Sequence, residues 1–192
     1  GQKNANDNNQ NLKYPKLDAR IAETYVAGST ATLKNSLYDS YIRAFRWASD
    51  RIDDEHGGVV GFVTNGGWID GNTGAGVRKS FYDEFDAIYI VNLRGGVRGM
   101  AGDAKKKEGD PFFGAIGGKG GCMATICLTF LVKGAQSRRV GEVRHDCHIY
   151  YTAVADYMTR EAKLDYLVQN KSIASKSIEW KRLTPDEHGD WL

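Results

Sequence analysis

Three short apolar, β-branched runs constrain the fold of this 192-residue chain more than any other feature of its sequence. They span residues 59–63, 87–91 and 124–132. Their length and composition are typical of strands that are buried on both faces of a sheet. Apolar residues at helical spacing predict helices over 37–52 and 74–84, one before each of the first two runs. This alternation favours an α/β sheet.

The chain changes character after the third run. A fourth run at 148–151 follows without an intervening helix, so we expect an antiparallel edge there, in which the third and fourth runs can pair as a hairpin. A helix is predicted near 159–169, with Leu164, Leu167 and Val168 on its inner side. A complete doubly wound sheet has more strands than this chain supplies. The pattern therefore predicts a partial Rossmann-like sheet with antiparallel edge strands that lacks its N-terminal strands.

Composition excludes several classes of protein. The formal net charge is +2, from 26 basic and 24 acidic residues, so any binding to nucleic acid must come from local basic patches. Three cysteines are too few for a disulfide framework and fit a reducing cytoplasm. No apolar run approaches the ~18 residues of a membrane span, and the polar N-terminus is not a signal peptide.

Residues 95–121 form a long segment rich in glycine and basic side chains, and loops of this length are rarely inert. We expect its cations to contact DNA phosphates, which position a duplex without reading its sequence; the alternative is a solvated loop. A P-loop is excluded because Gly118-Lys119 is followed by glycine instead of Ser or Thr. The candidate DNA-binding residues are Arg94, Arg98, Lys105, Lys106, Lys107 and Lys119.

Asn65, Gly66 and Trp68 directly follow the first apolar run. Ligands of open α/β sheets bind beyond the carboxyl ends of the strands, so these residues are candidates for lining a cleft. The alternative is a turn closed by Asn-Gly chemistry, with Trp68 as a packing anchor. No metal site is expected, because His145, Cys147 and His148 lack a second ligand pair at zinc-site spacing.

Four segments carry a resemblance to a known family. Residues 37–48 (LYDSYIRAFRWA) and 57–69 (GGVVGFVTNGGWI) resemble the helix and strand that follow the catalytic Asn-Pro-Pro-Tyr loop of gamma-class adenine DNA methyltransferases. The third segment runs from NLRG at 92–95 through KKEG at 106–109 to FFG at 112–114. With the tail LTPDEHGDWL at 183–192, these segments are similar to the methylase part of type ISP restriction-modification proteins and related predicted-helicase chains.

The resemblance implies a reaction and a role for one residue. The reaction is methyl transfer from S-adenosylmethionine to the exocyclic amine of adenine in double-stranded DNA. In this family an aromatic residue at the position of Phe113 stacks on the target adenine, which must be flipped out of the duplex because its amine is inaccessible there. The alternative is that Phe113, or its neighbour Phe112, is a core plug.

The resemblance also implies what this chain lacks. The Asn-Pro-Pro-Tyr motif and the cofactor-binding glycine loop do not occur in it and are expected upstream of Gly1. We therefore expect no cofactor and no catalytic residue in this fragment, which alone would be inactive. The expected divisions are a flexible or partly helical segment (1–36), the C-terminal half of a methyltransferase-like domain (37–155), and a helical extension toward target recognition (156–192).

The expected partners are DNA and other domains of the same polypeptide. A homodimer through an exposed sheet edge is a further possibility. The alternative function is a non-catalytic α/β module that binds DNA or another protein.

Overall fold

The computed structural model describes residues 13–97, 100–113, 122, 124–135 and 147–192. It contains one five-stranded sheet in the order β1-β3-β2-β4-β5. The strands are β1 (Gly58–Asn65), β2 (Ala87–Asn92), β3 (Ile126–Lys133), β4 (His148–Ala153) and β5 (Lys181–Leu183). The three apolar runs and the fourth run of the sequence therefore form β1 to β4, and only β5 was not predicted. Burial on both faces is wrong for β1, an edge strand whose Val59 and Val63 are 60% and 55% exposed.

β1, β2 and β4 run in the same direction, so their carboxyl ends lie at the same end of the sheet. β3 is antiparallel to both β1 and β2, β4 is parallel to β2, and β5 is antiparallel to β4. At this end Asn65 faces Ile126, and Asn92 lies between Cys127 and Ala153. The mixed, open α/β sheet with antiparallel edge strands confirms the predicted fold class.

One expected pairing is wrong. β3 and β4 form no hairpin, because β3 lies between β1 and β2 and β4 pairs with the far side of β2. The segment between β2 and β3 is long enough to bring the chain back antiparallel to β2. In this central position Cys127, Thr129 and Leu131 are fully buried. The apolar character of the run thus reflects a central strand and not an edge hairpin.

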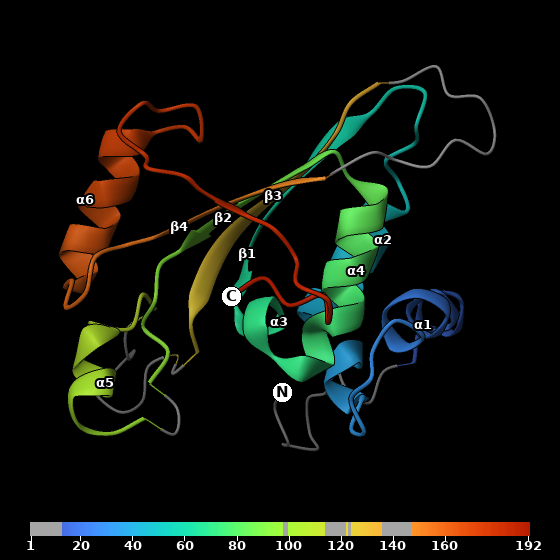
Figure 1. Ribbon diagram of the computed structural model, residues 1–192, viewed down its shortest axis with the longest axis horizontal. Helices are drawn as coiled ribbons and strands as arrows, with labels where there is room; N and C mark the ends of the chain where they lie inside the picture. Colours follow the sequence, from blue (N-terminus) through green and yellow to red (C-terminus); the bar gives the residue numbers. More distant parts are fainter. Residues whose placement is uncertain (1–12, 98–99, 114–121, 123, 136–146) are drawn as a thin grey trace.

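The helices fall into two groups (Figure 1). α1, α2 and α4 lie together near one end of the sheet, and α5 and α6 lie near the other. The predictions at 37–52, 74–84 and 159–169 correspond to α2, α4 and α6, whereas α3 and α5 were not predicted. None of the helices in the described ranges combines the length and apolarity that crossing a bilayer requires. The helical elements are α1 (Pro15–Ile21), the π-helix η1 (Ala22–Val26), the 3-10 helix η2 (Asn35–Tyr38), α2 (Ser40–Ser49), α3 (Gly67–Asp70), the 3-10 helix η3 (Asn72–Gly74), α4 (Ala75–Glu84), α5 (Gly102–Lys107) and α6 (Arg160–Asn170).

The main core joins segments from both ends of the chain. Tyr25 of η1, Phe45 of α2 and Phe81 of α4 are fully buried and pack edge to face, with ring centroids 5.1–6.1 Å apart. Trp191 near the C-terminus belongs to the same cluster. The core therefore includes residues from all three predicted divisions of the chain, and the division itself stays a prediction.

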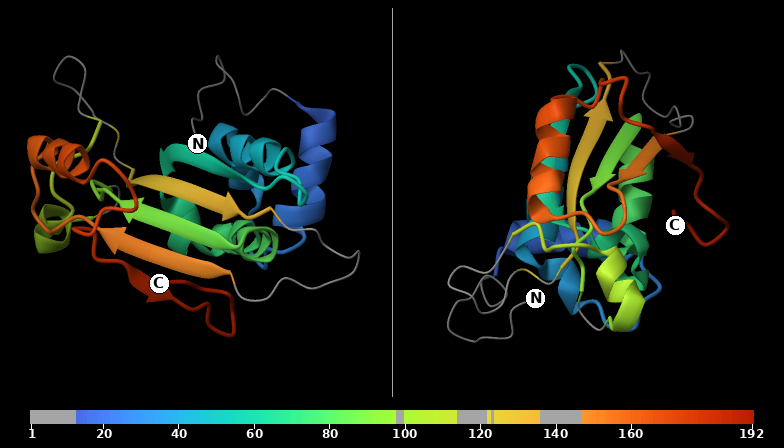
Figure 2. Two further views of the ribbon diagram at one scale, coloured as in Figure 1. Left: turned by 90° about the horizontal axis from the view of Figure 1, so that it is seen from above. Right: turned by 90° about the vertical axis from the view of Figure 1, so that its left-hand side faces the viewer.

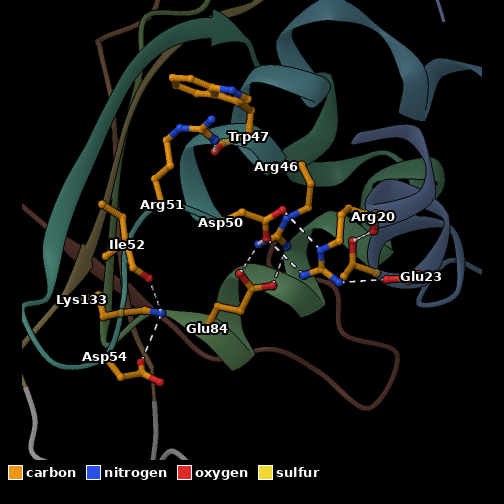
Figure 3. Close-up of polar contacts among 11 residues, drawn as sticks. Arg20, Glu23, Arg46, Trp47, Asp50, Arg51, Ile52, Asp54, Glu84 and Lys133 are labelled. Carbon is orange, nitrogen blue, oxygen red and sulfur yellow. Dashed lines mark hydrogen bonds and ion pairs between the residues drawn. The ribbon is translucent and has the colours of Figure 1, made fainter. Parts of the chain in front are cut away.

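The two arginines of α2, Arg43 and Arg46, lie inside the molecule and not on a solvated face of the helix. Arg46 is only 2% exposed, and its guanidinium binds both carboxylate oxygens of Glu84 at 2.6 and 2.7 Å. It also pairs with Asp50 at 2.7 Å, and Arg20 of α1 binds the same Asp50 (Figure 3). α1 and α4 cover this face of α2, and the ion pairs compensate for the burial of the charge.

The inner face of α6 also differs from the prediction. Leu167 packs against the second apolar cluster as expected. Leu164 and Val168, however, are 41% and 67% exposed, and Lys163 is fully buried. Lys163 stands three and four residues before Tyr166 and Leu167, so these three side chains share one face of the helix. The apolar pattern at 164 and 168 therefore marks an outer surface.

Candidate functional site

The carboxyl ends of β1, β2 and β4 define the candidate site. The left view of Figure 2 shows the arrowheads of β2 and β4 pointing to the same end of the sheet, where α5 and α6 lie. The segment between β2 and β3 leaves and re-enters the sheet at this end, because the end of β2 faces the start of β3. The basic loop predicted from the sequence is thus located at the end of the sheet where open α/β folds bind ligands.

Arg94 ties the end of β2 to the end of β4. Its backbone N–H donates to Asn92 Oδ1 at 2.7 Å, and its Nε donates to the Val154 carbonyl at 2.8 Å. Its guanidinium also pairs with Asp156 at 2.8 Å. Arg94 is therefore a structural cross-link between two strand exits, and its contact with a DNA phosphate stays a prediction.

The three consecutive lysines lie on α5. Lys105, Lys106 and Lys107 are all exposed, and Lys107 is 3.9 Å from the Asp103 carboxylate one turn earlier. The structure thus places these charges on the surface of the loop, and their contact with DNA stays a prediction. Arg98 and Lys119 lie outside the described residues.

The segment after α5 is held at the strand ends by backbone contacts. The Glu108 carbonyl accepts a hydrogen bond from Gly95 N–H at 3.1 Å, and its carboxylate accepts one from Gly96 N–H at 3.0 Å. Gly109 has a φ of +67° and lies so close to the Met158 backbone that a Cβ would collide with it. Asp110 N–H donates to the Met158 carbonyl at 3.0 Å. Residues 108–110 are therefore attached both to the exit of β2 and to the start of α6.

The two adjacent phenylalanines have different environments. Phe112 is partly buried and packs against the cluster formed by Val91, Leu93 and Ile126. Phe113 is 49% exposed, and its ring meets Phe112 edge to face at 5.2 Å and 90°. The sequence left open which ring is a core plug; the structure assigns packing to Phe112 and exposure to Phe113. The stacking role of Phe113 stays a prediction.

The residues after β1 are engaged in local packing. Asn65 Oδ1 accepts a hydrogen bond from Gly67 N–H at 2.7 Å, and Gly66 N–H donates to the Thr125 carbonyl at 2.9 Å. A Cβ on Gly66 would lie 2.6 Å from Cys127 Sγ, so any larger residue there would displace the Cys127 side chain. Trp68 is 1% exposed and therefore acts as a packing anchor. A cleft-lining role is not supported for Trp68, because its indole does not reach the surface.

Two buried cations at or near this end were not found by sequence reasoning. Lys163 Nζ donates to the carbonyls of Glu108 and Asp110 at 3.0 and 2.7 Å. Arg78 of α4 donates to the Trp68 and Gly71 carbonyls at 3.1 and 3.0 Å and pairs with Asp190. The sequence signal for Lys163 and Arg78 is a basic residue at a helix position that faces the core. Within the described ranges, no three His, Cys, Asp or Glu side chains are grouped to hold a metal ion.

The fold and this end of the sheet define a class: an open α/β domain with a lysine-bearing loop at the strand carboxyl ends. Comparison with solved structures narrows the class. The chain is similar along its whole length to part of the Type ISP restriction-modification enzyme LlaGI, solved as a nuclease-deletion mutant with a DNA substrate mimic. The two share 41% identity with a TM-score of 0.84, and the match covers 100% of this chain and 17% of LlaGI.

Two further solved structures agree. The ATP-dependent Type ISP restriction-modification enzyme LlaBIII, bound to DNA, shares 38% identity with a TM-score of 0.85, and the match covers all of this chain and 12% of that one. The DrdV–DNA complex, determined by cryo-electron microscopy, shares 37% identity with a TM-score of 0.81, and 17% of its chain is covered. This chain thus spans about a sixth or less of these proteins. No protein-family model and no curated protein matches it.

Proposed function

We propose that this chain is the base-holding part of an adenine-specific DNA methyltransferase domain within a restriction-modification polypeptide. Whole-length similarity to Type ISP enzymes solved with DNA supports the context. The motifs at 37–48, 57–69, 92–114 and 183–192 support the methyltransferase assignment. The observation that carries the proposal is the exposed ring of Phe113, presented at the strand carboxyl ends by the packed ring of Phe112.

In the proposed reaction, the methyl group of S-adenosylmethionine passes to the exocyclic amine of a flipped adenine by direct displacement. This chain holds the flipped base and the DNA backbone around it. Phe113 stacks on the extruded ring and offsets part of the unstacking cost, by about 1–3 kcal/mol. Lys105, Lys106 and Lys107 contact phosphates and position the duplex.

The proposal places the cofactor site outside this chain. The turn after β1 is closed by Gly66 against Cys127, and Trp68 is buried beneath it. The Asn-Pro-Pro-Tyr motif that orients the amine in the resembled family is absent from the sequence. We therefore assign cofactor binding and amine orientation to other residues of the proposed polypeptide. Binding of S-adenosylmethionine by the 192-residue chain in calorimetry would contradict this assignment.

One observation favours a second candidate. The outer face of α6 exposes Leu164 and Val168 one turn apart, which suits contact with another protein or domain. On this reading the chain is a non-catalytic interaction or DNA-binding module, and the exposure of Phe113 has no catalytic meaning. Substituting Phe113 separates the two candidates.

The decisive experiment replaces Phe113 in the full-length protein and uses two DNA substrates. Base flipping is followed by fluorescence in a duplex that carries 2-aminopurine at the target position, and methylation is followed in a matched duplex with adenine there. We expect Phe113→Ala to reduce methylation about 10- to 100-fold, which corresponds to the stacking energy of one base. Phe113→Trp restores it because the indole also stacks. Met100→Ala is the matched control, since Met100 is a comparably exposed apolar residue of the same loop. Unchanged methylation and flipping in Phe113→Ala would reject the proposal.

A further inference from the structure

Lys163 is a fully buried lysine whose partners are backbone carbonyls. Its Nζ lies 3.0 Å from the Glu108 oxygen and 2.7 Å from the Asp110 oxygen, both within hydrogen-bond distance. Burial lowers the pKa of Lys163, although the nearby Glu108 and Asp110 carboxylates act in the opposite direction. A buried cation is costly to a fold unless its donors are satisfied, so this contact is a specific one.

The two carbonyls belong to the segment that leads directly to the phenylalanines. Asp110 is followed by Pro111, whose ring fixes φ, and then by Phe112 and Phe113. Only two residues therefore separate the end of the Lys163 contact from the exposed ring. A displacement of the Asp110 carbonyl is transmitted to Phe113 through a short and restricted piece of backbone.

The start of α6 holds the same segment at further points. Arg160 N–H donates to Asp110 Oδ2 at 3.2 Å, and the Met158 carbonyl accepts from Asp110 N–H at 3.0 Å. Thr159 caps the helix by accepting from Ala162 N–H at 3.2 Å, which fixes its first turn. α6 thus begins as a rigid support with Lys163 one turn inside it.

We propose that Lys163 is a positioning residue that sets the height and orientation of the Phe113 ring over the strand carboxyl ends. Its ammonium group joins α6 to the carbonyls of Glu108 and Asp110 and so fixes the backbone that carries the ring. This inference rests on the proposed function for its catalytic consequence. The mechanical part, that Lys163 orders residues 108–113, stands independently of it.

The test uses Lys163→Met in the full-length protein, because methionine is unbranched and only one heavy atom shorter than lysine, and it removes the charge and all three donors. Hydrogen exchange of residues 108–113 should accelerate about tenfold or more, since hydrogen bonds to charged groups are the stronger ones in proteins. Exchange in β2 and β3 should not change. Lys176→Met is the matched control, because Lys176 is an exposed lysine after α6.

A role in positioning also predicts a spectroscopic effect that a general loss of stability does not produce. In Lys163→Met, the rise in 2-aminopurine fluorescence on DNA binding should fall about tenfold. The Kd values for DNA and for S-adenosylmethionine should stay within twofold of the unmodified protein. Lys163→Arg, which keeps a cation and its donors, should recover part of the signal. Two results for Lys163→Met would overturn the proposal and leave the proposed function intact. One is normal hydrogen exchange at 108–113; the other is a normal fluorescence rise while Phe113→Ala loses it.

Failure of the proposed function can be told apart from failure of the inference about Lys163. It appears as normal base flipping in Phe113→Ala, whereas the exchange measurement on Lys163→Met still decides whether the lysine orders the segment. If Lys163→Met does not fold, Asp110→Ala removes the carboxylate that accepts from Arg160 N–H and so weakens another contact between the same segment and α6. Faster exchange at 108–113 with reduced flipping supports the inference, and unchanged values of both contradict it.

Discussion

The indole of Trp191 packs edge to face against the indole of Trp68, with 5.8 Å between ring centroids. This contact joins the second-last residue of the chain to the turn that follows β1. Arg78 reinforces it, since the buried guanidinium donates to the Trp68 carbonyl at 3.1 Å and to the Gly189 carbonyl at 3.2 Å. It also pairs with Asp190. The tail motif at 183–192 is therefore anchored to the core through Leu183 and Trp191.

We expect Trp191→Ala to lower the free energy of unfolding by about 3 kcal/mol, near the lower limit for truncating a buried aromatic residue. The physical reason is the loss of the contact with Trp68 and the exposure of the aromatic cluster beneath it. Leu192→Ala is the control, because Leu192 is exposed and its truncation should cost less than about 0.5 kcal/mol. Urea denaturation followed by tryptophan fluorescence measures both, and equal midpoints would show that the tail does not contribute.

The ion pairs of α2 lead to a second prediction. Arg46→Met should destabilise the protein by about 3–5 kcal/mol, because it leaves the Glu84 carboxylate without the guanidinium that binds both its oxygens. Arg51→Met removes an exposed arginine from the turn that follows the same helix and should cost under about 1 kcal/mol. Thermal unfolding of the two variants gives the comparison. Similar values for both would mean that the buried pair carries no special stability.

Stability should also depend on acid pH through Asp50. Burial alone would raise the pKa of Asp50, but the hydrogen bond from Arg20 and the charge of Arg46 outweigh it and hold the pKa below its ordinary value. A lowered pKa stabilises the fold above the unfolded value of about 3.9 and ceases to do so as the pH falls through the folded value. We expect the melting temperature to fall below about pH 4 and to fall less steeply in Asp50→Asn. Parallel curves for the two proteins would contradict this origin.

The part of the fold that the sequence predicted is the part set by local pattern. The β-branched runs at 59–63 and 87–91 both become strands, as their composition predicts. Only the second is a central strand, whereas β1 lies at the edge of the sheet and exposes Val59 and Val63. Strand order was not predictable in the same way. β3 enters between β1 and β2 because of where a long connection returns, and this is a tertiary outcome that no local pattern encodes.

The candidate site shows the same limit. The loop with Phe113 was located from its glycine and lysine content, but the opposite environments of Phe112 and Phe113 depend on residues far along the chain, such as Met158 and Leu167. Lys163 was overlooked because two leucines and a valine define an apolar face that the structure turns outward in part. A buried cation looks like a surface residue until its carbonyl partners are located.

The two phenylalanines predict different effects on stability. Phe112→Ala should lower the free energy of unfolding by about 2 kcal/mol, less than for a fully buried ring because Phe112 is only partly covered. Phe113→Ala should cost under about 0.5 kcal/mol, because half of its ring already faces solvent. Chemical denaturation of both variants tests the assignment. A large loss in Phe113→Ala would show that this ring, too, belongs to the core.

The lysines of α5 predict a change in salt dependence. Suppose that Lys105, Lys106 and Lys107 each contact a phosphate in the proposed complex. When all three are replaced by Gln, DNA binding releases three fewer counterions, so the slope of log K against log salt becomes shallower by about 2.7. Specificity among DNA sequences should not change, because phosphate contacts carry no sequence information. Arg20→Gln is the control, since Arg20 is paired on α1, which lies apart from α5. Fluorescence anisotropy at several salt concentrations measures the slope, and an unaltered slope in the triple variant would leave the α5 lysines as a solvated surface.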